Sequence, residues 1–184
     1  MSSLDNVCRG TNSIKLDVLF ESEEVKGLII SAHGMLPILE ILEPCTVKSR
    51  QTTILRLLKV VNTVSCLSKR THSVTDHSKI ILNDVEIQEN LCFVGGIPII
   101  TKFAAKQYSN EIRLEAAAFV RQMYQTSTLT LQMFVSAGGL NVLVEFLDED
   151  YDETRDLVLI GVNGIWNVFE LQVGNLSRSN LRSR

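Results

Sequence analysis

Three copies of one glycine-containing motif divide this chain into units of similar length. The copies read HGMLPILEIL (33–42), GGIPIITKF (95–103) and GGLNVLVEFL (138–147). In each copy a glycine can take the positive φ that ends one helix, and the apolar residues after it begin the next helix. The second and third copies start 43 residues apart, which is within the range of helical solenoids. This period predicts stacked helical units, and such stacks usually bind proteins.

The spacing between the first two copies is longer than one repeat. Gly34 and Gly95 lie 61 residues apart, which is one period plus an insertion of about half a repeat. The excess coincides with the polar stretch SKRTHSVTDHSK (68–79), in which the helical spacing of apolar residues is lost. We therefore predict an inserted loop at 68–79.

Helical periodicity covers most of the remaining chain, and no segment alternates as a strand does. We expect helices at 22–32, 37–42, 52–67, 85–94, 98–105, 111–125, 128–136, 141–147 and 153–171. Three helices per unit favour the armadillo type over HEAT, which uses two. The expected fold is an all-α armadillo-type helical solenoid, a right-handed superhelix of about three to four units with incomplete terminal units.

The two long helices carry apolar faces that are expected to be buried. In the helix 111–125 this face consists of Ile112, Ala116, Phe119, Val120 and Met123. In the helix 153–171 the residues in phase are Val158, Val162, Ile165 and Phe169. Ser127 or Thr126 is expected to cap the helix 128–136.

The same periodicity suggests the limits of the domain. Residues 22–172 are expected to form the repeat domain, after a weakly structured segment (1–21) and before a disordered polar and basic tail (173–184). A terminal solenoid unit normally carries a polar capping face. Because the residues after 172 are too polar to form another unit, we expect Leu159 or Trp166 to be partly exposed and the chain to self-associate.

Composition narrows the function classes. Hydrophobic residues make up 45% of the chain and charged residues 21%, so a packed core is expected rather than global disorder. The net charge of −3 offers no basic stripe for nucleic acid. The first thirty residues contain no continuous apolar segment, which argues against a signal peptide or membrane span. The four cysteines form no C-x-x-C pair and are expected to be reduced cytosolic thiols.

The residue patterns of common active sites are missing from the sequence. The glycine pairs lack the spacing of a phosphate-binding loop, and no protein-kinase catalytic triplet occurs. His72 and His77 have no partners for a metal site, and the acidic turn 148–152 lacks the central glycine of a calcium loop. That acidic turn is expected to be solvated. We expect no enzyme activity, and no catalytic, cofactor or metal residues.

Polar residues within the long helices suggest a binding surface. Alignment of the two full units sets Arg113 against Arg155, Arg121 against Asn163, and Gln125 against Asn167. Polar residues four apart lie on one face of a helix, and in armadillo stacking the longest helix lines the concave side. The predicted partner-binding residues are Asn62, Arg121, Gln125, Asn163 and Asn167. The alternative is that these are ordinary solvated positions.

Several runs in the second half of the chain resemble one family. They are QENLCFVGGIP (88–98), EIRLEAAAFVRQ (111–122), LTLQMFVS (129–136), GIW (164–166) and FELQ (169–172). These runs resemble the C-terminal armadillo region of the fungal septation-initiation kinases and of the plant MAP-kinase-kinase-kinase epsilon proteins. The resemblance is close from 86 to 172 and looser from 27 to 64.

The resemblance implies a role outside the active site. In that family a serine/threonine kinase domain lies N-terminal, and the helical region serves regulation and localisation. The kinases act downstream of a small GTPase at the spindle pole body and promote septum formation at the end of mitosis. The implied partner is a septation-pathway small GTPase or scaffold, and the implied location is cytoplasmic, at the spindle pole body or division site.

The chain departs from the family pattern in two places. It has no kinase domain, and its array stops at Gln172, so we expect a fragment or a truncated gene product. Two other functions stay open: a regulatory segment that packs on its own kinase domain, and an adaptor of an unrelated pathway. An importin-type adaptor would need a regular Trp–Asn array, and this chain has one tryptophan. A catenin-type adaptor would need a basic groove, and this chain is acidic.

Overall fold

The computed structural model describes residues 35–65 and 77–182, with side chains at 35–65 and 85–173. The chain divides into two compact units, Met1–Ile87 and Gln88–Arg184, which are described separately. In the first unit, α4 (Met35–Leu42) packs against α5 (Gln51–Ser65). The helix α6 (His77–Phe93) begins in the first unit and ends in the second.

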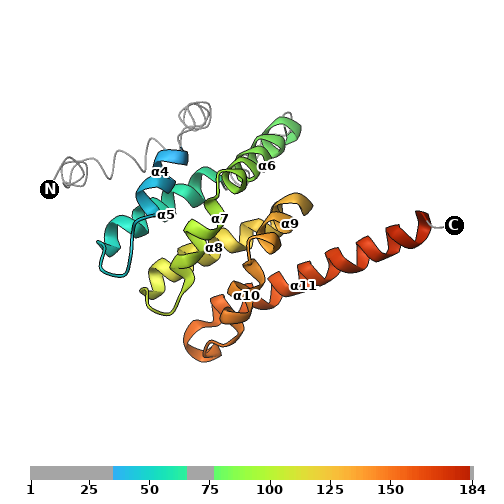
Figure 1. The fold of residues 1–184 in the computed structure, drawn as a ribbon. Helices are drawn as coiled ribbons and strands as arrows, with labels where there is room; N and C mark the ends of the chain where they lie inside the picture. Colours follow the sequence, from blue (N-terminus) through green and yellow to red (C-terminus); the bar gives the residue numbers. More distant parts are fainter. Residues whose placement is uncertain (1–34, 66–76, 183–184) are drawn as a thin grey trace. The chain divides into compact units, whose positions relative to one another are not determined.

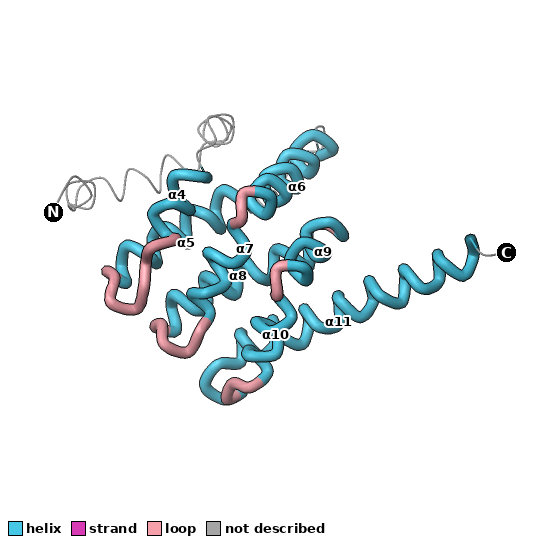
Figure 2. The backbone as a smooth tube through the Cα atoms, in the orientation of Figure 1, coloured by secondary structure: helices cyan, strands magenta, loops and turns pink. Residues whose placement is uncertain are grey.

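The second unit contains the clearest repeats (Figure 1). Its elements are α7 (Gly96–Thr101), the 3-10 helix η1 (Lys102–Ala104), α8 (Asn110–Thr126), α9 (Thr128–Ser136), α10 (Gly139–Leu147) and α11 (Tyr151–Arg182). Figure 2 shows that helices and loops account for the whole of the described chain, in which no strand occurs. This confirms the all-α solenoid class, whereas the right-handed superhelix stays a prediction.

Glycine pairs separate successive helices as the motif predicted. Gly95 has a φ of 82° and Gly138 a φ of 86°, a left-handed conformation that a residue with a side chain adopts only at a cost. The second glycine of the later pair has a different role. A Cβ on Gly139 would lie 2.4 Å from Cζ of Phe134, so this position needs a small residue because α9 and α10 approach closely. Gly34 lies outside the described residues.

The helix α8 forms the centre of the second unit. It packs against α7, η1, α9 and α11. All five residues of its expected apolar face are buried, and Phe119 is completely inaccessible to solvent. The prediction for this helix is therefore confirmed in both its position and its buried face.

The buried face of α11 differs from the expected one. Val162 and Phe169 are exposed, and Val158 and Ile165 are only half-buried. The buried residues are instead Leu157, Ile160, Gly161, Gly164 and Val168. A Cβ on Gly164 would lie 2.5 Å from Cδ2 of Leu143, and one on Gly161 would lie 2.9 Å from the Leu143 carbonyl oxygen. The glycines therefore let α11 lie directly against α10, and the larger apolar residues face away.

Several expected boundaries are also corrected. The last residues of the expected loop, 77–79, are the first residues of α6, which starts earlier than the expected helix 85–94. The expected helix 98–105 is α7 followed by η1. The other helices from 37 onward start within two residues of their expected starts. The expected segments 1–21 and 22–32 and the loop residues 68–76 lie outside the described residues.

The expected disordered tail is helical instead. The helix α11 continues from 173 to Arg182. Extending an existing helix adds one hydrogen bond per residue without a new nucleation step, and no proline interrupts this stretch.

Candidate protein-interaction surface

The structure places the five predicted partner-binding residues on three helices. Arg121 and Gln125 are exposed and lie one turn apart on α8. Asn163 is exposed and Asn167 half-buried, one turn apart on α11, and Nδ2 of Asn167 donates to the Asn163 carbonyl oxygen at 2.7 Å. The long helices α8 and α11 contact each other in the second unit. The two residues of each pair share one face of their helix because they lie four residues apart. A concave surface common to α8 and α11 stays a prediction.

Asn62 does not join these pairs within one unit. It is half-buried on α5, which belongs to the first unit. Its place in a shared binding surface stays a prediction.

An apolar residue extends the outward face of α8. Leu114 is exposed, lies two turns before Arg121, and was not among the predicted residues. Tyr124 lies close to this face but is buried; burial raises its pKa, and the positive charge of Arg121 partly opposes that effect. An outward face that combines apolar, amide and cationic side chains is typical of protein interfaces. The exposure of Leu114 depends on neighbouring helices, so periodicity alone could not reveal it.

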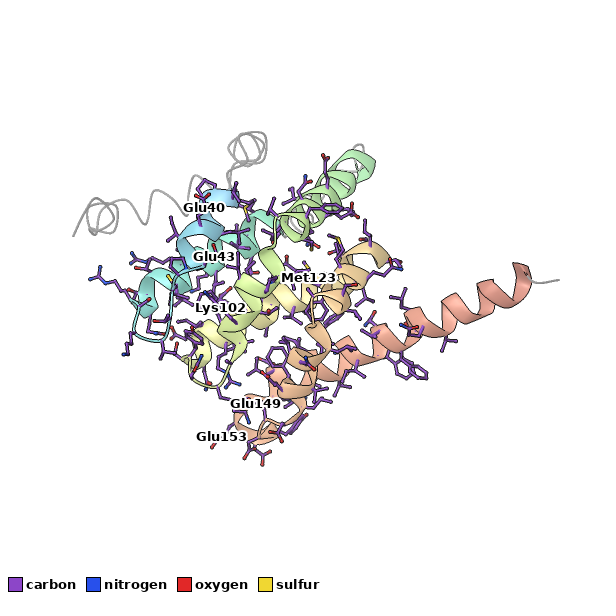
Figure 3. The ribbon with its side chains drawn as sticks, viewed as in Figure 1. Glu40, Glu43, Lys102, Met123, Glu149 and Glu153 are labelled. Atoms are coloured by element: carbon purple, nitrogen blue, oxygen red, sulfur yellow. The ribbon has the colours of Figure 1, made fainter. Side chains whose placement is uncertain are left out.

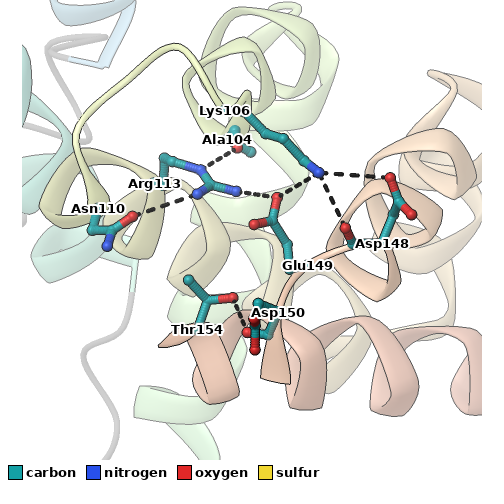
Figure 4. Close-up of polar contacts among 8 residues, drawn as sticks. All are labelled: Ala104, Lys106, Asn110, Arg113, Asp148, Glu149, Asp150 and Thr154. Atoms are coloured by element: carbon teal, nitrogen blue, oxygen red, sulfur yellow. Dashed lines mark hydrogen bonds and ion pairs between the residues drawn. The ribbon is translucent and has the colours of Figure 1, made fainter. Parts of the chain in front are cut away.

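A partly buried ionic network fixes the turn between α10 and α11 to α8 (Figure 4). The guanidinium of Arg113 donates from Nε to the Ala104 carbonyl oxygen at 3.1 Å and from Nη2 to the Glu149 carboxylate. Lys106 Nζ donates to the Asp148 carbonyl oxygen at 3.1 Å and lies 3.7 Å from Oε1 of Glu149. Because each group has several polar partners, the network joins consecutive repeats at one end of α8.

This network corrects two expectations. The alignment of Arg113 with Arg155 does not hold in space, since Arg113 is buried whereas Arg155 is exposed, with Cζ 5.9 Å from the Tyr151 ring centroid. The acidic turn is not uniformly solvated either. The Asp148 side chain is 88% exposed, but that of Glu149 is only 10% exposed and anchors the turn. Nothing in the spacing of acidic residues distinguished Glu149 from its neighbours.

Side-chain contacts also join α6 to α8 and α9 within the second unit. Nε2 of Gln88 donates to Oε1 of Gln122 at 3.2 Å, and both residues are buried. Ser127 caps α9 through a reciprocal pair of hydrogen bonds with Thr130, as expected. Its hydroxyl also lies 3.3 Å from Oε1 of Glu89. These contacts stabilise the stacking of the three helices and leave the outward face of α8 open.

Cys92 belongs to the core of this unit. Its Sγ lies 3.5 Å from Sδ of Met123, and burial, assisted by the negative charge of Glu89, raises the pKa of the thiol to about 12. Where side chains are described, no three His, Cys, Asp or Glu residues lie close enough together to hold a metal ion.

Cys92 is expected to resist alkylation in the native chain. With a pKa of about 12, the reactive thiolate is a fraction of roughly 10⁻⁴ at pH 8. Iodoacetamide at pH 8, followed by peptide mass mapping, should modify Cys45 well before Cys92, since Cys45 is only half-buried. Unfolding in guanidinium should equalise the two rates. Equal native rates would contradict the buried position of Cys92.

The described helices were also compared with the requirements of a membrane span. None of those helices alone combines sufficient length with sufficient apolar character. The pair α9 and α10 meets both criteria when joined, but it is bent by 86° at the break.

Sequence comparison identifies relatives of the chain. Cytokinesis protein sepH of Aspergillus niger is 66% identical over 157 residues, which cover 85% of this chain and 10% of sepH. Cell division control protein 7 of Schizosaccharomyces pombe is 41% identical over 84% of this chain and 13% of its own length. MAP3K epsilon protein kinase 1 of Arabidopsis thaliana is 37% identical over 86% of this chain and 10% of its own length. This chain is a homologue of one region of these proteins.

The homology confirms the resemblance to the septation and MAP3K epsilon kinases. The chain spans about a tenth of the length of these relatives. No protein-family model matches it. Among solved structures, a designed armadillo repeat protein in complex with the peptide (KR)4 aligns with 93% of this chain and 84% of its own length, at 16% identity and a TM-score of 0.44.

Proposed function

We propose that this chain is a non-catalytic protein-interaction module of a septation kinase, and that it binds a protein partner on the outward faces of α8 and α11. The observation that supports this proposal is the pair of polar residues one turn apart on each of two contacting long helices, with Arg121, Gln125 and Asn163 exposed and Asn167 half-buried. The homologues of the chain include a cytokinesis protein and a cell division control protein. The partner class that fits is a small GTPase or scaffold of the septation pathway, met at the spindle pole body or division site.

The outward faces of α8 and α11 together have the composition of an interface. Arg121 supplies a guanidinium with several donors, which can bind a carboxylate or carbonyl oxygens of a partner. Gln125 and Asn163 supply amides that both donate and accept, as the backbone of an extended partner segment requires. Leu114 adds apolar area beside them.

Replacing Arg121, Gln125, Asn163 and Asn167 together with alanine is expected to weaken binding to the pathway's GTPase or scaffold by about tenfold or more. Isothermal titration calorimetry with each purified candidate would measure the dissociation constant. The melting temperature should change little, since exposed substitutions rarely cost more than about 0.5 kcal/mol.

A matched control carries four alanines at exposed polar positions of other helices in the same unit: Asn90, Gln132, Asn141 and Glu145. This control should bind as the native chain does. If the first variant binds normally, the interface lies elsewhere and the proposal is wrong. Binding of a relative's isolated kinase domain, and of neither candidate, would favour the cis-acting alternative.

A further inference from the structure

Positive charge is concentrated in one part of the first unit, although the chain as a whole is acidic. Residues 44–65 contain no aspartate or glutamate and four cationic residues, Lys48, Arg50, Arg56 and Lys59. All four are exposed. The two acidic residues between 35 and 65 are Glu40 and Glu43, which lie on α4 and directly after its end (Figure 3). The turn before α5 and α5 itself therefore form a basic region.

The helical register of α5 gathers part of this charge on one face. Four exposed residues follow one another at spacings of four, three and four: Thr52, Arg56, Lys59 and Thr63. Residues at these spacings lie on one side of a helix. Ile54, Leu58 and Val61, on the other side, are buried. We call the four exposed residues the α5 face. It is about 16 Å long, since a helix rises about 1.5 Å per residue.

The cations of this region have no counter-charge in the described part of the chain. None of the four forms an ion pair with a carboxylate of the described residues. In the second unit, by contrast, Lys106 and Arg113 are paired with Glu149, and Arg155 lies against the ring of Tyr151. The cations of the first unit can therefore pair with a partner without first breaking an ion pair of their own, and such complementarity favours an acidic partner.

We propose that the α5 face binds an acidic protein segment in extended conformation. Carboxylates of the segment pair with Arg56 and Lys59, and the hydroxyls of Thr52 and Thr63 donate to its oxygens at the two ends. Alternate side chains of an extended chain lie about 6–7 Å apart on one side. This matches the separation of about 5–6 Å between positions one turn apart on a helix. The α5 face accommodates roughly five extended residues at about 3.3 Å each.

The composition of the basic region favours a protein over a nucleic acid. Residues 35–65 contain no aromatic side chain, so bases have no ring on which to stack. The α5 face carries two cations, whereas nucleic-acid surfaces neutralise many phosphates. The turn before α5 also exposes Val47, which adds apolar area beside the cations, as in protein interfaces. This surface is separate from the residues of α8 and α11 proposed to bind a partner.

Fluorescence anisotropy of the whole chain with a rhodamine-labelled (Glu-Ala)4 peptide tests the proposal. In about 50 mM NaCl the dissociation constant should be about 100 μM or lower, because several exposed ion pairs act together. Raising the salt to about 500 mM should weaken binding by about fivefold or more, since exposed charges are screened. A (Gln-Ala)4 peptide should bind far more weakly. Absence of binding to (Glu-Ala)4, or equal binding of the two peptides, would overturn the proposal.

Arg56→Glu and Arg155→Glu form a matched pair of variants. Both positions are exposed arginines on long helices, and both substitutions change the net charge equally, but only Arg56 belongs to the α5 face. Arg56→Glu should weaken binding of (Glu-Ala)4 by about tenfold, since an attraction becomes a repulsion. Arg155→Glu should change it by less than about twofold. Equal effects would mean that net charge alone controls binding, and the α5 face would then not be the site.

A neutral double variant separates lost ion pairs from introduced repulsion. Arg56→Gln with Lys59→Gln should weaken binding of (Glu-Ala)4 by about fivefold, while circular dichroism shows unchanged helicity. Unchanged binding in this variant would contradict the pairing of carboxylates with these two residues. A rhodamine-labelled oligonucleotide of eight thymidines tests the partner class. It should bind more weakly than (Glu-Ala)4 at equal salt, and tighter binding would overturn the assignment of a protein partner.

Discussion

Replacing Phe119 with alanine is expected to lower the free energy of unfolding by about 3–5 kcal/mol. The ring is completely inaccessible on α8, which packs against four other elements of the second unit. Removing it deletes buried apolar area and leaves a cavity that the packed helices can only partly fill. Urea denaturation followed by circular dichroism would measure the change, with the slope of the transition checked for each variant.

Phe93→Ala is the control for this substitution. It deletes the same atoms from an exposed position at the end of α6, so its effect should stay within about 0.5 kcal/mol. A cost below about 1 kcal/mol at Phe119 would mean that α8 buries a different face in solution.

The second large effect is expected at Arg113, where Arg113→Met should cost about 3 kcal/mol or more. Its side chain is 6% exposed and that of Glu149 10% exposed, so the substitution leaves a nearly buried carboxylate without its main partner. Lys106 stays near Glu149 but is itself 59% exposed, and its charge compensates only in part. The carbonyl oxygen of Ala104 also loses a donor.

A double variant separates the ion pair from the packing of the arginine. Arg113→Met with Glu149→Leu removes both charges, and it should recover at least about 1 kcal/mol relative to Arg113→Met alone. Arg155→Met is the control on α11, where the guanidinium is exposed, and it should have little effect. Additive costs in the double variant would show that Arg113 and Glu149 are not energetically coupled.

The repeat period and the helix content follow from local physics. Gly95 and Gly138 take a backbone conformation that other residues avoid, so helix ends can be recognised from residue type alone. The spacing of Phe119 and its neighbours likewise reports the buried face of α8, because large apolar residues on a helix gather on the side away from water. The family resemblance also rests on contiguous runs, which need no knowledge of contacts.

The face of α11 is a different case, because large apolar side chains alone do not show which side packs. Periodicity in the sequence predicts a buried face of larger residues, Val158, Val162, Ile165 and Phe169. The structure selects the glycine side, since only there can the α11 backbone approach Leu143 of α10. Close approach depends on the shape of the neighbour, and that information is absent from the helix itself.

For charged residues, too, the sequence gives the position on a helix, and the neighbouring groups decide the burial. Arg113, Arg121 and Arg155 are indistinguishable as residue types on long helices, yet Arg113 is buried and the other two are exposed. What separates them is the position of Glu149, 36 residues along the chain, which compensates the charge of Arg113 in space. The sequence alone therefore predicts repeats, helices and family from short-range patterns. Which face α11 buries, and which charges are structural, follows from contacts between repeats, because burial and compensation are properties of neighbouring groups.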